Sequence, residues 1–178
     1  MSNNRNCQII IRLADFSDAT DIADLLKDSF SEYKDLYTKR AFTETVLGVY
    51  KIKERIYNKR TWIILVDGVI KGTMSLIPAH DTLYIKSVAV APTARRRGLS
   101  KLMLEHAEHE AKRMRLRYLE LTTTHFLSAA LRLYENFGFE QRGQKDLYGT
   151  PLIRMIKDLK ASIFSLNKPA NNYNNQLS

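Results

Sequence analysis

The apolar residues of this chain recur at helical spacing in four segments. Apolar side chains stand three or four positions apart there, which is typical of a helix with one buried face. The segments are residues 17–30, 38–57, 99–114 and 128–137. In the second segment, the side chains expected to face inward are Phe42, Val46, Tyr50 and Tyr57. Gly48 weakens that helix, because glycine costs about 1 kcal/mol in a helix interior relative to alanine.

Short apolar and β-branched runs lie between these helices and predict strands. The runs are residues 8–12, 62–66, 69–77, 83–90, 117–123, 139–144 and 152–157. Asp67-Gly68 joins two of them in a tight hairpin, since both positions of such a turn need a positive φ. The strand, helix and strand from residue 83 to residue 123 predict a parallel βαβ unit with a right-handed crossover.

The order of these elements predicts one domain of the α/β class. We expect a central mixed, mostly antiparallel sheet of about seven strands, with about four helices covering both faces. The domain should span residues 8–160, after an N-terminal arm of residues 1–7. Residues 161–178 are polar and Asn-rich, so we expect them to form a disordered tail.

A basic turn joins a strand to a helix at residues 88–104. Pro92 ends the apolar run, Arg95-Arg96-Arg97-Gly98 follows, and the helical pattern begins at Leu99. The first N–H groups of a helix have no partner inside it, and the helix dipole places partial positive charge there. Such a junction can bind a phosphate group, although a short basic run can equally be solvated surface.

Composition narrows the possible partners. The net charge of +9 suggests nucleic acid, but the basic residues are scattered and no nucleic-acid-binding motif accompanies them. Those outside the turn, Arg55 among them, are equally explained as solubilising surface. No apolar run approaches the roughly 20 residues of a membrane span, and the first residues lack the apolar core of a signal peptide. We therefore expect a soluble, cytoplasmic protein that binds neither membrane nor nucleic acid.

Cysteine and histidine give no sign of a metal site. Cys7 is the single cysteine, and the four histidines do not follow a metal-ligand spacing. We expect no metal cofactor.

Two motifs resemble those of the GNAT superfamily of N-acetyltransferases. The first is the basic turn, where Arg95-x-x-Gly98-x-Ser100 is similar to the family's acetyl-CoA motif. The second is Leu133-Tyr134-Glu135-x-x-Gly138-Phe139, about thirty residues later. The order of predicted elements from residue 8 to residue 157 also resembles the fold of this family.

The resemblance implies an N-acetyltransferase that uses acetyl-CoA as co-substrate. A primary amine would attack the thioester directly in a ternary complex, without an acyl-enzyme. Tyr134 would be the general acid, and the backbone N–H of Val90 would stabilise the oxyanion of a tetrahedral intermediate. The strand of residues 83–90 would splay from its parallel neighbour near Val88 to Val90. The residues implied in binding acetyl-CoA are Val88, Ala89, Val90, Arg95, Arg96, Arg97, Gly98, Leu99, Ser100 and Lys101.

The chain departs from the family pattern at several positions. Arg96 stands where many members have Gly, and Leu127 stands where Asn often binds the cofactor. Tyr84 stands where some protein-acetylating members carry a Glu base, so the base is not identified. Glu120 is a candidate, and the alternative is a carboxylate on the polar edge of a strand. These departures motivate a second hypothesis, a non-catalytic acyl-CoA-binding sensor or interaction module on the same fold.

The sequence does not identify the acceptor amine, which is either a small molecule or a protein. Residues 30–60 and the loops at 78–82 and 144–151 should bind it, because loops vary with function on a shared fold. Acidic side chains in these segments can attract an ammonium, and they are Glu32, Asp35, Glu44 and Asp81. A homodimer is left open.

Overall fold

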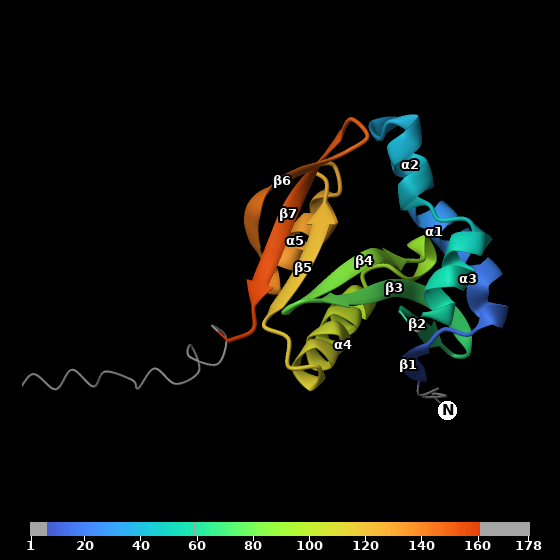
Figure 1. Ribbon diagram of the computed structural model, residues 1–178. Coiled ribbons are helices and arrows are strands. Elements are labelled where there is room, and N and C mark those ends of the chain that lie inside the picture. The colour runs from blue at the N-terminus through green and yellow to red at the C-terminus, as the bar shows by residue number, and fades with distance from the viewer. Residues whose placement is uncertain (1–6, 59, 161–178) are drawn as a thin grey trace, which may run out of the picture.

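The computed structural model describes residues 7–58 and 60–160 of the chain (Figure 1). The expected disordered tail lies outside these residues. The same holds for the expected N-terminal arm, apart from Cys7.

Within the described residues, seven strands form one mixed sheet in the order β1-β2-β3-β4-β5-β7-β6. Neighbouring strands are antiparallel except β4 and β5, which are parallel. The predicted sheet and the predicted βαβ unit are therefore confirmed. The strands are β1 Ile9–Leu13, β2 Thr61–Val66, β3 Val69–Ala79, β4 Thr82–Val90, β5 Tyr118–Thr123, β6 Glu140–Leu147 and β7 Thr150–Asp158.

Five α-helices flank the sheet in the described part of the chain. They are α1 Ala19–Phe30, α2 Lys39–Thr45, α3 Val49–Tyr57, α4 Leu99–Arg113 and α5 Ser128–Asn136. Three short 3-10 turns join them to the rest, and these are η1 Phe16–Asp18, η2 Ser31–Leu36 and η3 Pro92–Ala94.

The single helix expected over residues 38–57 is wrong. Gly48 has an extended backbone, with φ −73° and ψ 162°, and it separates α2 from α3. The break changes the rotation of α3 about its axis, so Tyr50 and Tyr57 are 84% and 76% exposed instead of buried. The side chains that face the core here are Leu47, Ile52 and Ile56.

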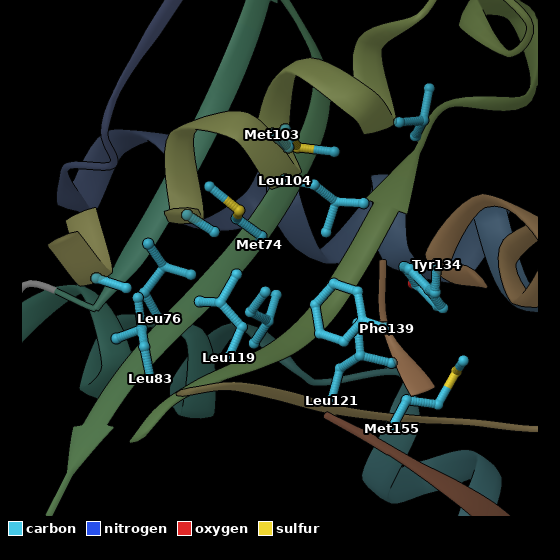
Figure 2. Close-up of a cluster of buried hydrophobic side chains, with 14 of the residues drawn as sticks. Met74, Leu76, Leu83, Met103, Leu104, Leu119, Leu121, Tyr134, Phe139 and Met155 are labelled. Carbon is cyan, nitrogen blue, oxygen red and sulfur yellow. The ribbon is translucent and has the colours of Figure 1, made fainter. Parts of the chain in front are cut away.

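Two clusters of buried apolar side chains lie on opposite faces of the sheet, as the sequence predicts. Helices α4 and α5 pack over one face, and Figure 2 shows the core beneath them, including Met74, Leu104 and Leu119. Helices α1 and α3 pack over the other face, where Ile22, Ile52 and Ile63 are buried. Burial of apolar surface on both faces holds the sheet rigidly enough to position a site at its centre.

Strands β4 and β5 pair only over their first residues. Their register covers Thr82–Tyr118, Leu83–Leu119 and Tyr84–Glu120, and beyond it the strands diverge (Figure 1). A bulge lies in β4 at this point, where Ser87 has φ 52°. Because a bulge bends its strand, it turns the end of β4 away from β5. The predicted splay beside Val88 to Val90 is confirmed.

Candidate active site

A cavity of about 290 Å³ lies in the gap between β4 and β5. Its lining residues belong to both core clusters, so the cavity connects the two faces of the sheet. The two strands and the loop after β5 contribute Ile85 to Val88, Leu121 to Thr124, and Leu127. Helix α5 contributes Tyr134, and the opposite face contributes Phe30, Tyr37, Glu44, Thr45 and Arg55.

Tyr134 is held at the cavity by the way helix α5 ends. Gly138 has φ 93°, and its N–H donates to the carbonyl of Glu135 at 3.0 Å. The N–H of Phe139 donates to the carbonyl of Tyr134, also at 3.0 Å. These two bonds form a Schellman motif, which is completed by an apolar contact between Tyr134 and Phe139. The rings of Tyr134 and Phe139 supply that contact, with centroids 6.0 Å apart (Figure 2).

Burial keeps the phenol of Tyr134 in its protonated form. The side chain is 7% exposed, and burial raises its pKa to about 12. Tyr37 lines the same cavity, and burial raises its pKa to about 12 although a hydrogen bond with Thr124 opposes this. Near neutral pH both phenols are therefore proton donors.

The backbone of Val90 points into the gap. Ala91 donates its N–H to the carbonyl of Lys71 at 2.9 Å, so the adjacent pair Val90–Gly72 exchanges no hydrogen bonds. The N–H and C=O of Val90 consequently point away from β3, toward the side of β5. Ser29 of α1 donates its hydroxyl to this carbonyl at 3.2 Å. The N–H of Val90 points the same way and can serve a ligand in the gap.

The N-terminus of α4 presents unpaired backbone donors. The first bond of this helix runs from the N–H of Leu102 to the carbonyl of Gly98 at 3.1 Å, so the N–H groups of residues 99–101 precede it. Gly98 has φ 77° and supplies no side-chain cap. Together with the helix dipole, this turn can bind an anion.

The three arginines of the basic turn have different surroundings. Arg95 forms an ion pair with Glu32 and donates to the carbonyl of Ser29 at 3.0 Å, which ties the turn to α1 and η2. Arg96 adopts a left-handed backbone with φ 61°, the conformation that Gly would adopt there. All three side chains are exposed. Of the three, Arg95 is the one held by protein carboxylate.

Glu120 has a structural environment. It is 2% exposed, and its carboxylate accepts hydrogen bonds from Arg154 at 2.9 and 2.6 Å and from Lys145 at 2.9 Å. Burial opposes its ionisation, but these hydrogen bonds outweigh it and lower the pKa. Glu120 does not line the cavity. This geometry favours an ion-pair anchor between β5, β6 and β7 over a base.

Sequence reasoning did not single out Tyr37, Arg55 or Lys86, which are among the polar side chains that line the cavity. Arg55, expected as solubilising surface, instead donates to Ser87 Oγ at 2.8 Å and to Ser75 Oγ at 3.3 Å. The signal available was its position between the core residues Ile52 and Ile56. Of the acidic candidates for attracting an ammonium, Glu44 lines the cavity.

Residues 7–58 and 60–160 hold no cluster of three or more His, Cys, Asp or Glu side chains that could hold a metal ion. No helix in the same ranges is long and apolar enough to cross a membrane.

The profile of the Acetyltransferase (GNAT) family matches residues 19–139. The chain belongs to the GNAT family. The matched range contains both motifs and most of the cavity lining. The uncharacterized N-acetyltransferase YjgM of Escherichia coli (strain K12) is 30% identical over 83 residues, which are 44% of this chain and 50% of YjgM. The chain thus aligns with about half the length of this curated relative.

Solved structures share the GNAT fold. The PaiA N-acetyltransferase of Thermoplasma acidophilum in complex with coenzyme A has a TM-score of 0.72 at 17% identity, over 85% of this chain and 99% of that one. YncA of Salmonella typhimurium, a putative acetyltransferase with acetyl-CoA, has a TM-score of 0.67 at 20% identity, over 85% and 94%. The ribosomal-protein-S18-alanine N-acetyltransferase of Escherichia coli has a TM-score of 0.63 at 17% identity, over 85% and 94%.

The two buried phenols of this GNAT domain should make it less stable as the pH becomes alkaline. An unfolded tyrosine titrates near pH 10, so neutral Tyr37 and Tyr134 contribute fully below about pH 10 and lose that contribution as the pH rises toward about 12. Tyr37→Phe should therefore lose less free energy of unfolding than the wild type between about pH 9 and pH 11. Urea denaturation at both pH values measures this. Equal losses would show that Tyr37 titrates normally.

Proposed function

We propose that this chain is an N-acetyltransferase that transfers the acetyl group of acetyl-CoA to a primary amine by direct attack. The observation that carries the proposal is a buried, protonated Tyr134 at a cavity that passes between β4 and β5. Backbone donors follow along the chain, at Val90 at the end of β4 and on the first turn of α4. GNAT membership and the fold shared with structures containing coenzyme A or acetyl-CoA support the assignment.

The cofactor would be held by backbone rather than by the prominent arginines. The N–H groups of residues 99–101 bind the pyrophosphate, and Gly98 allows close approach because it lacks a Cβ. The exposed strand edge at Val88 to Val90 binds the amide groups of the pantetheine. Arg96, Arg97 and Lys101 add positive charge near the phosphates, whereas Arg95 stays paired with Glu32.

Bound acetyl-CoA supplies an acetyl group activated as a thioester. The amine nitrogen bonds to the acetyl carbon as the carbon–sulfur bond breaks. The N–H of Val90 donates to the acetyl oxygen as negative charge develops there. Tyr134 gives its phenolic proton to the departing sulfur and is reprotonated from solvent.

The amine must be neutral to attack, so its ammonium form has to lose a proton. Glu44 lines the cavity, and its carboxylate pairs with Lys51 at 3.0 Å while the side chain remains 37% exposed. We assign Glu44 the role of attracting the ammonium, with the proton leaving through water. The nitrogen gives up a second proton to water as the amide forms. Glu120 has no part in this proposal because it does not line the cavity and is buried between Arg154 and Lys145.

Calorimetric titration with acetyl-CoA, followed by thiol release across a panel of primary amines, tests the function. Binding together with amine-dependent thiol release is the expected result. Absence of binding at millimolar cofactor would contradict the proposal. Binding without release on any amine would instead favour a non-catalytic acyl-CoA sensor, a role suggested by Leu127, which leaves the start of α5 without a side-chain cap.

Gly98→Ala should weaken both folding and cofactor binding. Its φ of 77° costs a residue with a Cβ about 1 kcal/mol, and relief of that strain would shift the turn that holds the pyrophosphate. We expect a free energy of unfolding lower by about 1 kcal/mol and a higher Kd for coenzyme A. Gly68→Ala is the matched control. It has φ 79° in the β2–β3 hairpin and open space around the new Cβ, so it should lose stability without changing the Kd. An unchanged Kd in Gly98→Ala would exclude this turn from the site.

A further inference from the structure

Four cationic side chains gather on the sheet face opposite α4, and two of them, Arg55 and Lys86, line the cavity. This cationic face consists of Arg55, Lys86, Lys145 and Arg154. Glu120 accepts hydrogen bonds from Lys145 and Arg154, so two of the four cations share its single negative charge. Among the described residues, no carboxylate lies within 4.0 Å of Arg55 or Lys86, whereas Glu44 is paired with Lys51. Two cations that line the cavity therefore have no carboxylate at ion-pair distance, and Glu54 and Glu44 attract Arg55 only from farther away.

Arg55 is the anchor of this face. It reaches from α3 across the sheet, where Ser87 and Ser75 hold its Nη1 at 2.8 and 3.3 Å. These partners are neutral hydroxyls, although a guanidinium has five N–H donors in a fork that matches a carboxylate. Burial lowers its pKa, so the protein keeps this charge partly desolvated at a cost. Ser87 sits at the bulge that opens the gap, which places Arg55 beside the site of chemistry.

Lys86 adds a second positive charge on the same side. It lines the cavity from β4, two residues from the end of the β4–β5 pairing. Partial desolvation and the positive charges of Arg55 and Lys145 lower its pKa. A ligand bearing only an ammonium would be repelled here, since like charges at short range raise its energy. An anionic group on the ligand would instead neutralise both cations.

We propose that the acceptor of this enzyme is a small amine that carries a carboxylate, of the size and kind of a free amino acid. Arg55 binds the carboxylate in its guanidinium fork, and Lys86 adds charge. The amino group then lies toward the gap, on the side of Glu44. The cavity of about 290 Å³ must hold the acetyl end of the cofactor together with the acceptor, which favours a small acceptor. This inference rests on the proposed N-acetyltransferase function and specifies its substrate class.

Steady-state kinetics with matched acceptors tests the assignment. The panel is a set of free amino acids and the corresponding amino-acid carboxamides, which differ only in the negative charge. Wild type should acetylate one or more of the amino acids with a kcat/KM well above that of its carboxamide. Arg55→Gln should raise KM for that amino acid by about 10- to 100-fold, the size expected for lost hydrogen bonds to a charged group. Its KM for the carboxamide should change by less than about 3-fold.

Two controls separate this effect from damage to the fold. Lys53→Gln removes an exposed cation from the same helix and should leave both acceptors unaffected. A misfolded Arg55→Gln protein would lose activity on both acceptors equally. Arg55→Lys keeps the charge without the fork, and it should therefore reverse part of the increase in KM for the amino acid. Two outcomes overturn this inference and leave the acetyltransferase proposal intact. One is equal use of the amino acid and its carboxamide by wild type. The other is an equal increase in KM for both acceptors in Arg55→Gln and in Arg55→Lys. No transfer to any amine overturns both.

Discussion

Tyr134→Phe is expected to lower kcat by about 10²- to 10⁴-fold, the range of a lost general acid. The substitution removes one hydroxyl and keeps the ring that packs against Phe139. Because the phenol acts on the departing sulfur and does not hold the cofactor, the Kd for acetyl-CoA should change little. Thiol release under saturating substrates and calorimetric titration of the cofactor measure the two quantities separately.

Tyr50→Phe is the matched control for this experiment. Tyr50 is 84% exposed and lies outside the cavity, so its substitution should leave kcat unchanged. A Tyr134→Phe protein that loses cofactor affinity and turnover to the same extent would show that Tyr134 has a packing role. The burial of Tyr134 alone is compatible with packing, and the separation of kcat from Kd is what distinguishes the two roles.

The position of Tyr134 could be predicted from the sequence because local backbone chemistry fixes it. Gly138 ends α5 in a left-handed conformation, and Phe139 follows as the apolar contact of the Schellman motif. These conformational preferences act within six residues, so a short sequence motif is enough to predict them. The same holds for the turn before α4, where Arg96 and Gly98, two positions apart, adopt positive φ.

Arg55 could not be assigned from the sequence because its environment depends on contacts that are distant along the chain. Ser75 and Ser87, which hold its guanidinium, are 20 and 32 residues away. Its burial also depends on the break at Gly48, which sets the rotation of α3. A periodic pattern read through Gly48 as one helix points Tyr50 inward and leaves Arg55 on the surface. The wrong helix boundary therefore hid the contact of Arg55 with the cavity, although the sequence had already indicated residues 30–60 as the acceptor side.

Glu120 illustrates the opposite error. A carboxylate in an apolar strand is a reasonable candidate for a base, because burial raises the pKa of an isolated acid. Its two cationic partners come from β6 and β7, whose pairing with β5 is not visible in the local pattern. Once both partners are present, the pKa falls and the carboxylate stabilises the sheet.

Phe139→Ala should be the most destabilising substitution near the site, lowering the free energy of unfolding by about 3–4 kcal/mol. Phe139 is 3% exposed, and its ring contacts both Tyr134 and Phe137, so truncation leaves a cavity within the core that α5 covers. Phe139→Leu fills most of that volume and should retain more than half of the lost stability. Urea denaturation of the two variants measures the difference. Equal losses in both would mean that the aromatic ring itself, and not the filled volume, fixes the end of α5 and with it the position of Tyr134.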